Sequence, residues 1–395
     1  MNILYLDIRF SFMSFGTSGK FNGGNNYTKK IIDLLMNNVK PDWELVLVVN
    51  EVIYQNLNEK LCSAFKFLIV NSLRDVKVKD CQEVLFIPHV NDSKGYLREL
   101  KDFKMSHNSC KIYLTIHDRR HSDVFFDKYA GVFKKGIKRF PVIFFIGKYI
   151  KSKSTDSVIK RFIALADKVF TVSNFSLQAL SDIKSLKNIN FYLPVYQPNK
   201  SNKVSIIAEN DIKKQKYILF VSAGRSEKNF IRALLAFQQY VNQHNDETIK
   251  MVITGISQNQ INNLVNKKIV RDSFIKKSLI IFDYVEQEQL IDLYRNCYCL
   301  LFTSFSEGFG LPVAEAILFG KPIVASWRTA IPEVAGSVGI YVNPFSISSI
   351  KDGIEKVMNK SKYKFIIDLL HIKKEILQNQ IKLDDDLLLN DIFEV

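Results

Sequence analysis

Short apolar runs alternate with amphipathic segments along most of this 395-residue chain. Helical patterns such as Asn229–Asn242 and Gln287–Asn296 lie between most of the runs. Strands that alternate with helices pair in parallel, and near-continuous apolar strands need cover on both faces, so the pattern predicts doubly wound parallel sheets of the α/β class. The candidate strands are Ile3–Leu6, Glu44–Val49, Val84–Ile87, Ile112–Ile116, Lys168–Val172, Asn190–Leu193, Tyr217–Val221, Lys250–Thr254, Leu279–Asp283, Cys299–Phe302, Pro322–Ala325 and Gly339–Val342.

A polar stretch from Gln197 to Gln215 divides this alternation into halves of similar size. The chain is too long for one ordinary core. We therefore expect a Rossmann-like domain over residues 1–197 and a second over residues 198–395, the latter ending in a helical, weakly acidic tail from about Ser346. In such sheets ligands bind beyond the carboxyl ends of the strands, where the motifs described below also fall.

The formal net charge is +15 and the sequence pI is about 9.3. Such a surplus favours a phosphorylated ligand, an anionic lipid or nucleic acid, although abundant lysine also suits plain solvated surface. The cysteines are odd in number and fit no zinc spacing, which predicts reduced thiols in a cytosolic protein. They are Cys62, Cys81, Cys110, Cys297 and Cys299. Met1–Asp7 has the pattern of a buried strand and not of a signal peptide, and no apolar run reaches the ~18 residues that a transmembrane helix needs.

The stretch Ser306–Ala316 follows an apolar run and leads into a helix-forming run. Gly308 and Gly310 let the backbone turn and approach a ligand closely, and Pro312 suits the first turn of a helix. Free N–H groups at that helix start favour a diphosphate. Glu307 can accept hydrogen bonds from sugar hydroxyls, and Glu315 from a ribose diol. Alternatively, either glutamate is only a first-turn acid that the helix dipole favours.

A second motif, Val221–Asn229, lies where a strand gives way to a helix. Its cations Arg225 and Lys228 are three residues apart and can neutralise a pyrophosphate leaving group. Two exposed surface cations are the alternative.

A third motif, Thr115–His121, directly follows a strand. His117 can donate to a substrate hydroxyl or phosphate, while His121 and the preceding arginines Arg119 and Arg120 are candidates for the acceptor side. A metal would need a third ligand, and none is evident, so we expect no metal site. A structural histidine at a strand end is the alternative for both histidines.

A fourth motif, Phe21–Tyr27, brings the pair Gly23 and Gly24 to the start of an amphipathic segment. A glycine pair there can approach a phosphate or a sugar. The motif lacks the full G-x-G-x-x-G pattern of dinucleotide binding, and a plain turn explains it about equally well.

The fifth motif, Phe133–Lys151, places cations around a short aromatic and aliphatic core. This suits a segment that lies on an anionic membrane surface. A buried helix with lysine stems along its surface is the equal alternative. Nucleic acid is not expected, because its partners spread aromatic residues along a basic groove.

The stretch Glu307–Glu315, in the form E-G-F-G-L-P-x-x-E-A, resembles the E-x7-E signature of the retaining glycosyltransferases of family 4. The resemblance covers roughly residues 1–345 and is more specific in the C-terminal half. Further segments fall in the order of that family: Ile116–Asp118, Ala166–Ser173, Arg225 with Lys228, Asp283–Val285, Gly320–Ser326 and Ile331–Val334.

The resemblance implies a GT-B fold, with two Rossmann-like domains facing across a cleft, and a nucleotide-diphosphate sugar as substrate, held without metal or cofactor. It implies that Glu307 contacts the donor sugar, Glu315 the ribose, and Arg225 and Lys228 the diphosphate. The remaining expected donor contacts are the backbone from Gly308 through Phe309, Gly310 and Leu311, the pair Tyr284 and Val285, and, from the other domain, His117 with Gly23 and Gly24.

This sequence departs from the family pattern in three places. Arg225 and Lys228 are three residues apart where many members have five, Asp283 stands where a glycine often does, and the helix that crosses back to the first domain is hard to identify after residue 375.

The sequence thus predicts a cytoplasmic, metal-independent retaining hexosyltransferase, peripheral at the inner membrane face. Its donor would be a hexose or deoxyhexose nucleotide, and its acceptor a hydroxyl of a surface glycan such as capsule, O-antigen or a lipid-linked oligosaccharide. The alternatives are a sugar-nucleotide epimerase of the same fold and a non-catalytic protein that binds glycan or nucleic acid.

Overall fold

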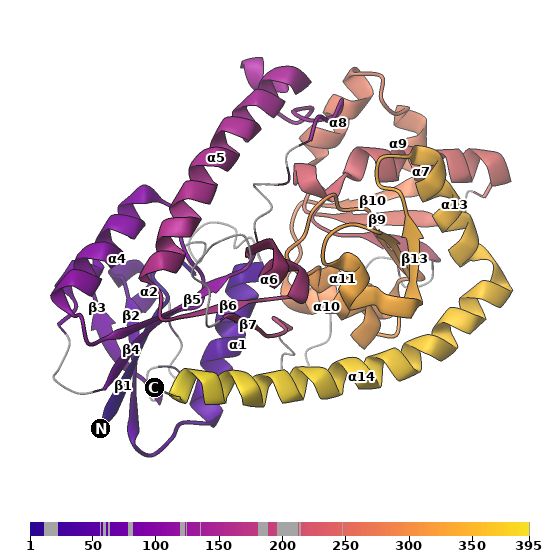
Figure 1. Ribbon diagram of the computed structural model, residues 1–395. Coiled ribbons are helices and arrows are strands. Elements are labelled where there is room, and N and C mark those ends of the chain that lie inside the picture. The colour runs from indigo at the N-terminus through magenta and orange to yellow at the C-terminus, as the bar shows by residue number, and fades with distance from the viewer. Residues whose placement is uncertain are drawn as a thin grey trace. The chain divides into compact units, whose positions relative to one another are not determined.

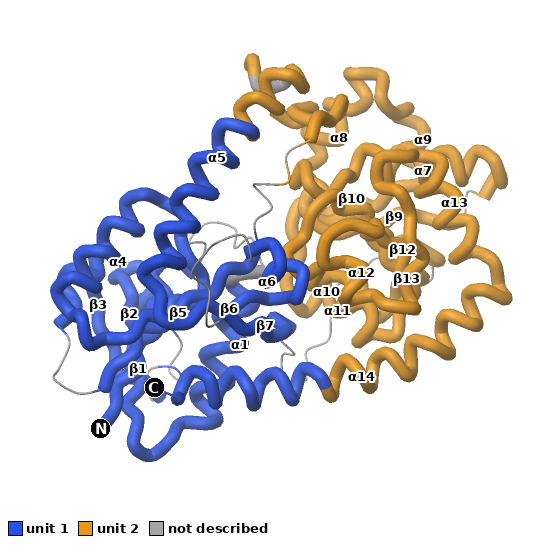
Figure 2. The backbone as a smooth tube through the Cα atoms, viewed as in Figure 1, with its two compact units in different colours: residues 1–122, 149–197, 380–395 blue, residues 123–148, 198–379 orange. Residues whose placement is uncertain are grey.

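The computed structural model describes residues 1–11, 23–55, 57, 61, 64–77, 82–118, 123, 125–134, 136–180, 189–195, 212, 215–246 and 248–394. These residues form two compact units, each built on its own parallel sheet (Figures 1 and 2).

The sheet of unit 1 has seven described strands in the order β3-β2-β1-β4-β5-β6-β7, all parallel. Buried side chains on one face pack with helix α1 and the end of helix α14, and those on the other face pack with α4 and α5. The strands are β1 (Asn2–Asp7), β2 (Trp43–Val49), β3 (Lys66–Ile69), β4 (Glu83–Ile87), β5 (Lys111–Ile116), β6 (Lys168–Thr171) and β7 (Ile189–Phe191). The helices in this half of the chain are α1 (Gly23–Asn37), α2 (Glu51–Tyr54), α4 (Lys94–Ser106), α5 (Pro141–Leu165) and α6 (Asn174–Leu180), with 3-10 turns η1 (Leu73–Asp75) and η3 (Gly136–Arg139).

The sheet of unit 2 has six strands in the order β10-β9-β8-β11-β12-β13, again all parallel. Helices α7, α8, α9 and α13 share one core with the strands. The strands are β8 (Tyr217–Phe220), β9 (Lys250–Thr254), β10 (Leu279–Phe282), β11 (Cys299–Phe302), β12 (Ile323–Ser326) and β13 (Gly339–Val342). The helices are α7 (Phe230–His244), α8 (Gln258–Asn266), α9 (Asp272–Ser278), α10 (Gln287–Asn296), α11 (Leu311–Leu318), α12 (Ile331–Ala335), α13 (Ile347–Met358) and α14 (Lys360–Phe393), with 3-10 turns η6 (Ser226–Lys228) and η7 (Gly336–Val338).

Every strand expected from the apolar runs is present, and the doubly wound parallel architecture is confirmed. One strand, β3, was not expected. It lies at the edge of its sheet, and none of its four residues is fully buried. An edge strand therefore left no continuous apolar run in the sequence.

The two units meet along the chain at Gln197 and Pro198, where the polar stretch begins. They differ from a simple division at that point in two segments. Asp123–Lys148 belongs to unit 2, although it precedes the break, and Gln380–Val395 belongs to unit 1, although it follows the break (Figure 2). Both exceptions have a physical cause in side-chain contacts, because aromatic rings and ion pairs hold each segment to its unit.

The end of α14 completes the core of unit 1. Leu388, Leu389, Ile392 and Phe393 are buried with residues of β1 and β2, and the Phe393 ring meets Trp43 at a centroid distance of 5.2 Å. Polar contacts fix the same segment. The buried Lys30 ammonium pairs with Asp385 and donates to the Leu193 carbonyl at 2.5 Å, and the Leu193 N–H donates to Asp384 at 3.1 Å.

Leu388→Ala is expected to lower the free energy of unfolding of unit 1 by about 2–5 kcal/mol, since it leaves a cavity beneath a side chain that is 0% exposed. Leu387→Ala is the matched control, because the neighbouring side chain is 46% exposed and should cost under about 0.5 kcal/mol. Urea unfolding of both variants tests this. Equal losses would mean that this part of α14 does not pack as described.

Cys110, Cys297 and Cys299 are buried free thiols, as expected, and Cys62 and Cys81 lie outside the described residues. None of the helices in the described part of the chain combines the length and the apolar character that crossing a bilayer demands.

Candidate functional site

The turn between β11 and α11 is built from a buried strand that runs into a tight polar loop. Thr303 and Ser304 are fully buried directly after the strand, and the Phe305 N–H donates to the Glu227 carbonyl at 2.8 Å. This bond ties the turn to η6, the equivalent turn after the neighbouring strand β8. Two strand ends of the sheet therefore form one polar surface, at the edge where doubly wound sheets bind ligands.

Gly310 makes the start of α11 possible. Its φ of 98° lies in the left-handed region, where a side chain would strain the backbone. Pro312 occupies the first turn of the helix. Among the described residues, the backbone N–H groups of Phe309, Gly310 and Leu311 have no hydrogen-bond acceptor. Together with the positive end of the helix dipole, they can bind an anion.

Lys228 and Glu307 form a buried ion pair across this surface. Lys228 Nζ lies 2.6 Å from Glu307 Oε1, and the two residues are only 5% and 7% exposed. The ammonium also lies 4.7 Å from the centre of the Phe302 ring. The sequence motifs did not predict that these two expected donor contacts would bind each other. A buried pair with both partners present is tolerated, whereas either charge alone would not be.

Polar groups around the pair fix the Glu307 carboxylate. Ser304 Oγ donates to Glu307 Oε1 at 2.6 Å, and the Glu307 N–H donates to Thr329 Oγ1 at 3.1 Å. Asn229, in the left-handed region with φ of 60°, donates to the Thr303 carbonyl at 3.2 Å. The carboxylate is therefore held in place before any ligand arrives.

Glu315 lies in the second turn of α11. Burial raises the pKa of its carboxyl from 4.5 to about 7, against the opposing effects of the nearby Tyr294 hydroxyl and the Lys228 ammonium. The residue as a whole is half-buried. A carboxyl with this pKa can accept hydrogen bonds from a diol once it is ionised.

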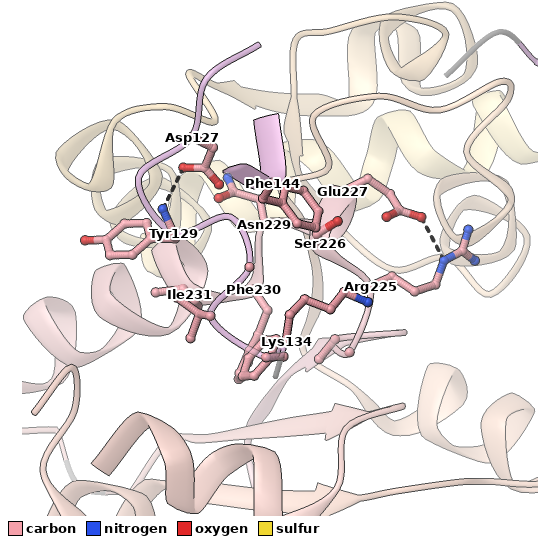
Figure 3. Close-up of a pocket in the computed structure, with 15 residues that line it drawn as sticks. Asp127, Tyr129, Lys134, Phe144, Arg225, Ser226, Glu227, Asn229, Phe230 and Ile231 are labelled. Atoms are coloured by element: carbon pink, nitrogen blue, oxygen red, sulfur yellow. Dashed lines mark hydrogen bonds and ion pairs between the residues drawn. The ribbon is translucent and has the colours of Figure 1, made fainter. Parts of the chain in front are cut away.

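The Arg225 side chain pairs with a different glutamate from that of Lys228. Its Nε lies 2.9 Å from Glu227 Oε1, and it lines a cavity of about 230 Å³ together with Lys134, which precedes α5, and Phe144 in the first turn of α5 (Figure 3). Its guanidinium is 40% exposed. The structure therefore places the two expected diphosphate cations in different surroundings, one in the buried pair and one on the wall of this cavity.

The segment Asp123–Lys148 is fastened to unit 2 beside the site. Arg232 pairs with Asp127 at 2.7 Å, and Arg328 donates to both carboxylate oxygens of Asp123 at 2.9 and 3.1 Å. Between these pairs the Phe125 ring contacts Phe305, with centroids 4.7 Å apart, and Phe345, with centroids 5.2 Å apart. Arg328 also donates to the Phe305 carbonyl at 2.9 Å, so the same guanidinium holds both the segment and the site turn.

Tyr284 and Val285 follow β10, the edge strand of the same sheet. Val285 is buried, and the half-buried Tyr284 hydroxyl donates to Glu286 at 3.3 Å. They share the carboxyl edge of the sheet with the site turn, but strands β9 and β8 lie between β10 and β11.

The remaining expected residues lie in unit 1. His117 follows β5, and its Nε2 lies 2.9 Å from the Pro88 carbonyl. Tyr27 of α1 meets the His117 ring edge-on at a centroid distance of 5.0 Å. Gly23 and Gly24 are the first two residues of α1, one turn before Tyr27. Arg119, Arg120 and His121 lie outside the described residues.

Sequence reasoning missed Ser304, Thr329 and Tyr294. Ser304 had a usable signal, because it directly follows a buried strand at the carboxyl edge of the sheet. Thr329 and Tyr294 had none, since they reach the site from β12 and α10 through the fold alone. Within the described part of the chain, no cluster of His, Cys, Asp or Glu side chains is arranged to hold a metal ion.

Two doubly wound parallel sheets, each the core of its own unit, define the GT-B fold, and comparison with solved structures confirms this class. Sucrose-phosphate synthase from Thermosynechococcus elongatus superposes with a TM-score of 0.68 at 12% identity, covering 100% of this chain and 98% of that one. Anabaena Alr3699/HepE, solved in complex with UDP and glucose, gives a TM-score of 0.67 at 12% identity over 100% of both chains. Residues 202–367 match the family model of the glycosyl transferases group 1.

Two of the similar curated proteins are named as mannosyltransferases. O-antigen chain mannosyltransferase B of Escherichia coli is 30% identical over 138 residues, which is 34% of this chain and 35% of that protein. O-antigen chain mannosyltransferase RfbU of Salmonella typhimurium is 24% identical over 251 residues, or 62% and 60% of the two chains. The chain therefore spans about a third to three fifths of these two relatives.

Proposed function

We propose that this protein is a retaining glycosyltransferase that moves a hexose, with mannose the first candidate, from a nucleotide-diphosphate sugar to a hydroxyl of a surface glycan. The observation that carries the proposal is the buried Lys228–Glu307 pair beside the unbonded N–H groups at the start of α11. A buried cation next to a helix start suits a diphosphate, and a carboxylate fixed at the same place suits sugar hydroxyls. The names of the relatives support mannose and an O-antigen type of acceptor.

In the proposed reaction the bond between the sugar C1 and the phosphate oxygen breaks, and a bond from C1 to the acceptor oxygen forms on the same face. The acceptor proton passes to the departing phosphate oxygen, and a nucleoside diphosphate leaves. Lys228 and the N–H groups of Phe309, Gly310 and Leu311 stabilise the charge that grows on the diphosphate. Glu307 orients the sugar, and Glu315 accepts from the ribose. The charge that these groups supply makes a metal unnecessary in this proposal.

Arg225 has a less direct part in the proposal. Its guanidinium is half-exposed and already paired with Glu227. Its remaining N–H groups are available for a phosphate, but it lies on the wall of the cavity and not in the buried pair beside the start of α11, so we assign Lys228 the larger share of diphosphate binding.

A thermal-shift panel of nucleotide-diphosphate sugars tests the donor assignment. The cognate donor, GDP-mannose being the first choice, should stabilise the protein by about 2.7 kcal/mol at a concentration one hundred times its Kd. Glu315→Gln should lose most of this stabilisation, and Glu375→Gln, which changes an exposed acid on α14, should keep it. No stabilisation by any nucleotide sugar would exclude the proposal.

The same reagents separate the alternatives. Labelled donor without acceptor should stay unchanged, whereas an epimerase would produce a new sugar nucleotide. Binding to DNA with a steep salt dependence, and no binding of donor, would instead indicate a non-catalytic protein that uses its positive charge.

A further inference from the structure

The turn η3 and the first turns of α5 expose large apolar side chains. Ile137 in η3 is 68% exposed. Six more side chains, which we call the apolar face, are between 40% and 64% exposed: Phe140, Val142, Ile143, Ile146, Tyr149 and Ile150. Scattered apolar residues are ordinary on a surface, but seven within fourteen positions form a contiguous patch.

The first part of α5, up to about Thr155, is oriented the opposite way to an ordinary surface helix, whereas the later part buries apolar side chains such as Val158 and Phe162. Val142, Ile146 and Tyr149 follow helical spacing and lie exposed on one side. The polar Ser152 and Thr155 are buried on the other side, at 6% exposure each. Lys148 also points inward, where it donates to the Asp123 carbonyl at 3.2 Å and lies 5.1 Å from the centre of the Phe125 ring. A helical segment that buries polar groups and exposes apolar ones is suited to contact an apolar partner outside the chain. The alternative of a buried helix is therefore wrong for this part of α5.

The charge around the apolar face has one sign. From Lys128 to Thr155 the sequence contains eight lysines and arginines and no aspartate or glutamate. Lys134, Lys151 and Lys153 are exposed. Lys153 continues the apolar face by one turn, and its ammonium lies 5.6 Å from the centre of the Tyr149 ring.

Helix α14 carries a second exposed apolar stripe, which differs from the apolar face in the charges that surround it. Phe365, Ile372, Ile376, Leu383 and Leu387 are between 46% and 64% exposed. Acids and bases both flank that stripe, among them Asp368, Glu375 and Lys382. Along the sequence from Lys128 to Thr155 the apolar face on α5 is accompanied only by bases, and the nearest acid further along α5 is Asp156. A second copy of this chain seated there would bring the exposed cations Lys134, Lys151 and Lys153 against the same cations of its partner, whereas anionic lipid headgroups would neutralise them.

We propose that the apolar face docks on an anionic lipid bilayer, with its aliphatic and aromatic side chains at the level of the acyl chains and its lysines at the headgroups. The residues of the apolar face up to Lys148 belong to unit 2. In that unit Arg328 links Asp123 to the turn that carries Glu307. Membrane binding therefore anchors the unit that contains the Lys228–Glu307 pair, and does so whether or not the protein transfers a sugar.

Co-sedimentation of the full chain with lipid vesicles tests this proposal. Wild-type protein should sediment with phosphatidylcholine vesicles that contain phosphatidylglycerol, and much less with phosphatidylcholine alone or at high salt. Ile143→Ser/Ile146→Ser should lower the partition coefficient at least about tenfold, because two apolar side chains leave the acyl region. Ile372→Ser/Ile376→Ser, which changes the α14 stripe in the same way, is the matched control and should bind as wild type does.

Unchanged melting temperatures would show that both double variants fold. Wild-type binding that ignores lipid charge, or equal loss in the two double variants, would overturn the proposal. So would a protein that ignores vesicles but forms a dimer that Ile143→Ser/Ile146→Ser dissociates, since the face would then bind a second copy. Donor binding in the thermal-shift panel is independent of all these outcomes, so the two proposals fail separately.

Discussion

Lys228→Met is expected to lower the free energy of unfolding by about 3–5 kcal/mol and to abolish sugar transfer. The physical reason is the carboxylate that remains. Glu307 is 7% exposed, so without the ammonium at 2.6 Å it is a buried charge with only neutral hydrogen-bond donors such as Ser304. Urea unfolding measures the first effect, and release of nucleoside diphosphate in the presence of acceptor measures the second.

The double variant Lys228→Met/Glu307→Leu separates stability from function. Removing both charges should restore most of the lost stability, because apolar groups of similar size replace a buried pair at little cost. Transfer should stay absent, since both proposed donor contacts are gone. Lys276→Met, which breaks the exposed pair with Asp272, is the control and should leave the unfolding curve unchanged. A double variant as unstable as the single one would show that the pair is not the source of the effect.

Glu315→Gln is expected to have the opposite effect on stability. The pKa of the Glu315 carboxyl is about 7 in the folded protein against 4.5 without burial, so the folded state binds this proton more tightly than the unfolded state does. Stability from this group is therefore lost as the pH rises from about 4.5 to about 7, and the folded protein carries a cost of about 3 kcal/mol above that range. Glutamine carries no such cost.

Unfolding experiments at two pH values check this sign. At pH 8 Glu315→Gln should be more stable than wild type by up to about 3 kcal/mol, and at pH 4 the two should be alike. The same variant should bind donor more weakly, because an amide replaces the carboxylate proposed for the ribose. A variant that loses stability at pH 8 would mean that the Glu315 carboxylate is held by a favourable partner and is not a cost to the apo protein.

Much of the fold followed from the sequence because its strands are buried on both faces. Apolar runs such as Cys299–Phe302 mark such strands directly. The edge strand Lys66–Ile69 has only partly buried and exposed residues and gave no such run. The assignment of Asp123–Lys148 to unit 2 also had no sequence signal, since Asp127–Arg232 and Phe125–Phe345 are contacts between residues more than a hundred positions apart.

The sequence predicted where the site lies better than how its side chains are arranged. Strand ends and glycines pointed to the turns that carry Lys228 and Glu307. That these two side chains pair with each other, while Arg225 pairs with Glu227, depends on side-chain directions that spacing does not encode. The raised pKa of Glu315 likewise arises from enclosure by the fold, with Tyr294 reaching it from α10.

The packing of Phe393 on Trp43 has a consequence for the order in which the chain can fold. Trp43 is made early in synthesis, but its neighbour in the core emerges from the ribosome only 350 residues later, after all of unit 2. During translation the core on the α1 side of the amino-terminal sheet stays incomplete until the end of α14 is made, while the unit made before that can fold first. The half of the protein that is synthesised first is thus the half that finishes folding last, which makes it the part most exposed to chaperones and to aggregation on the way.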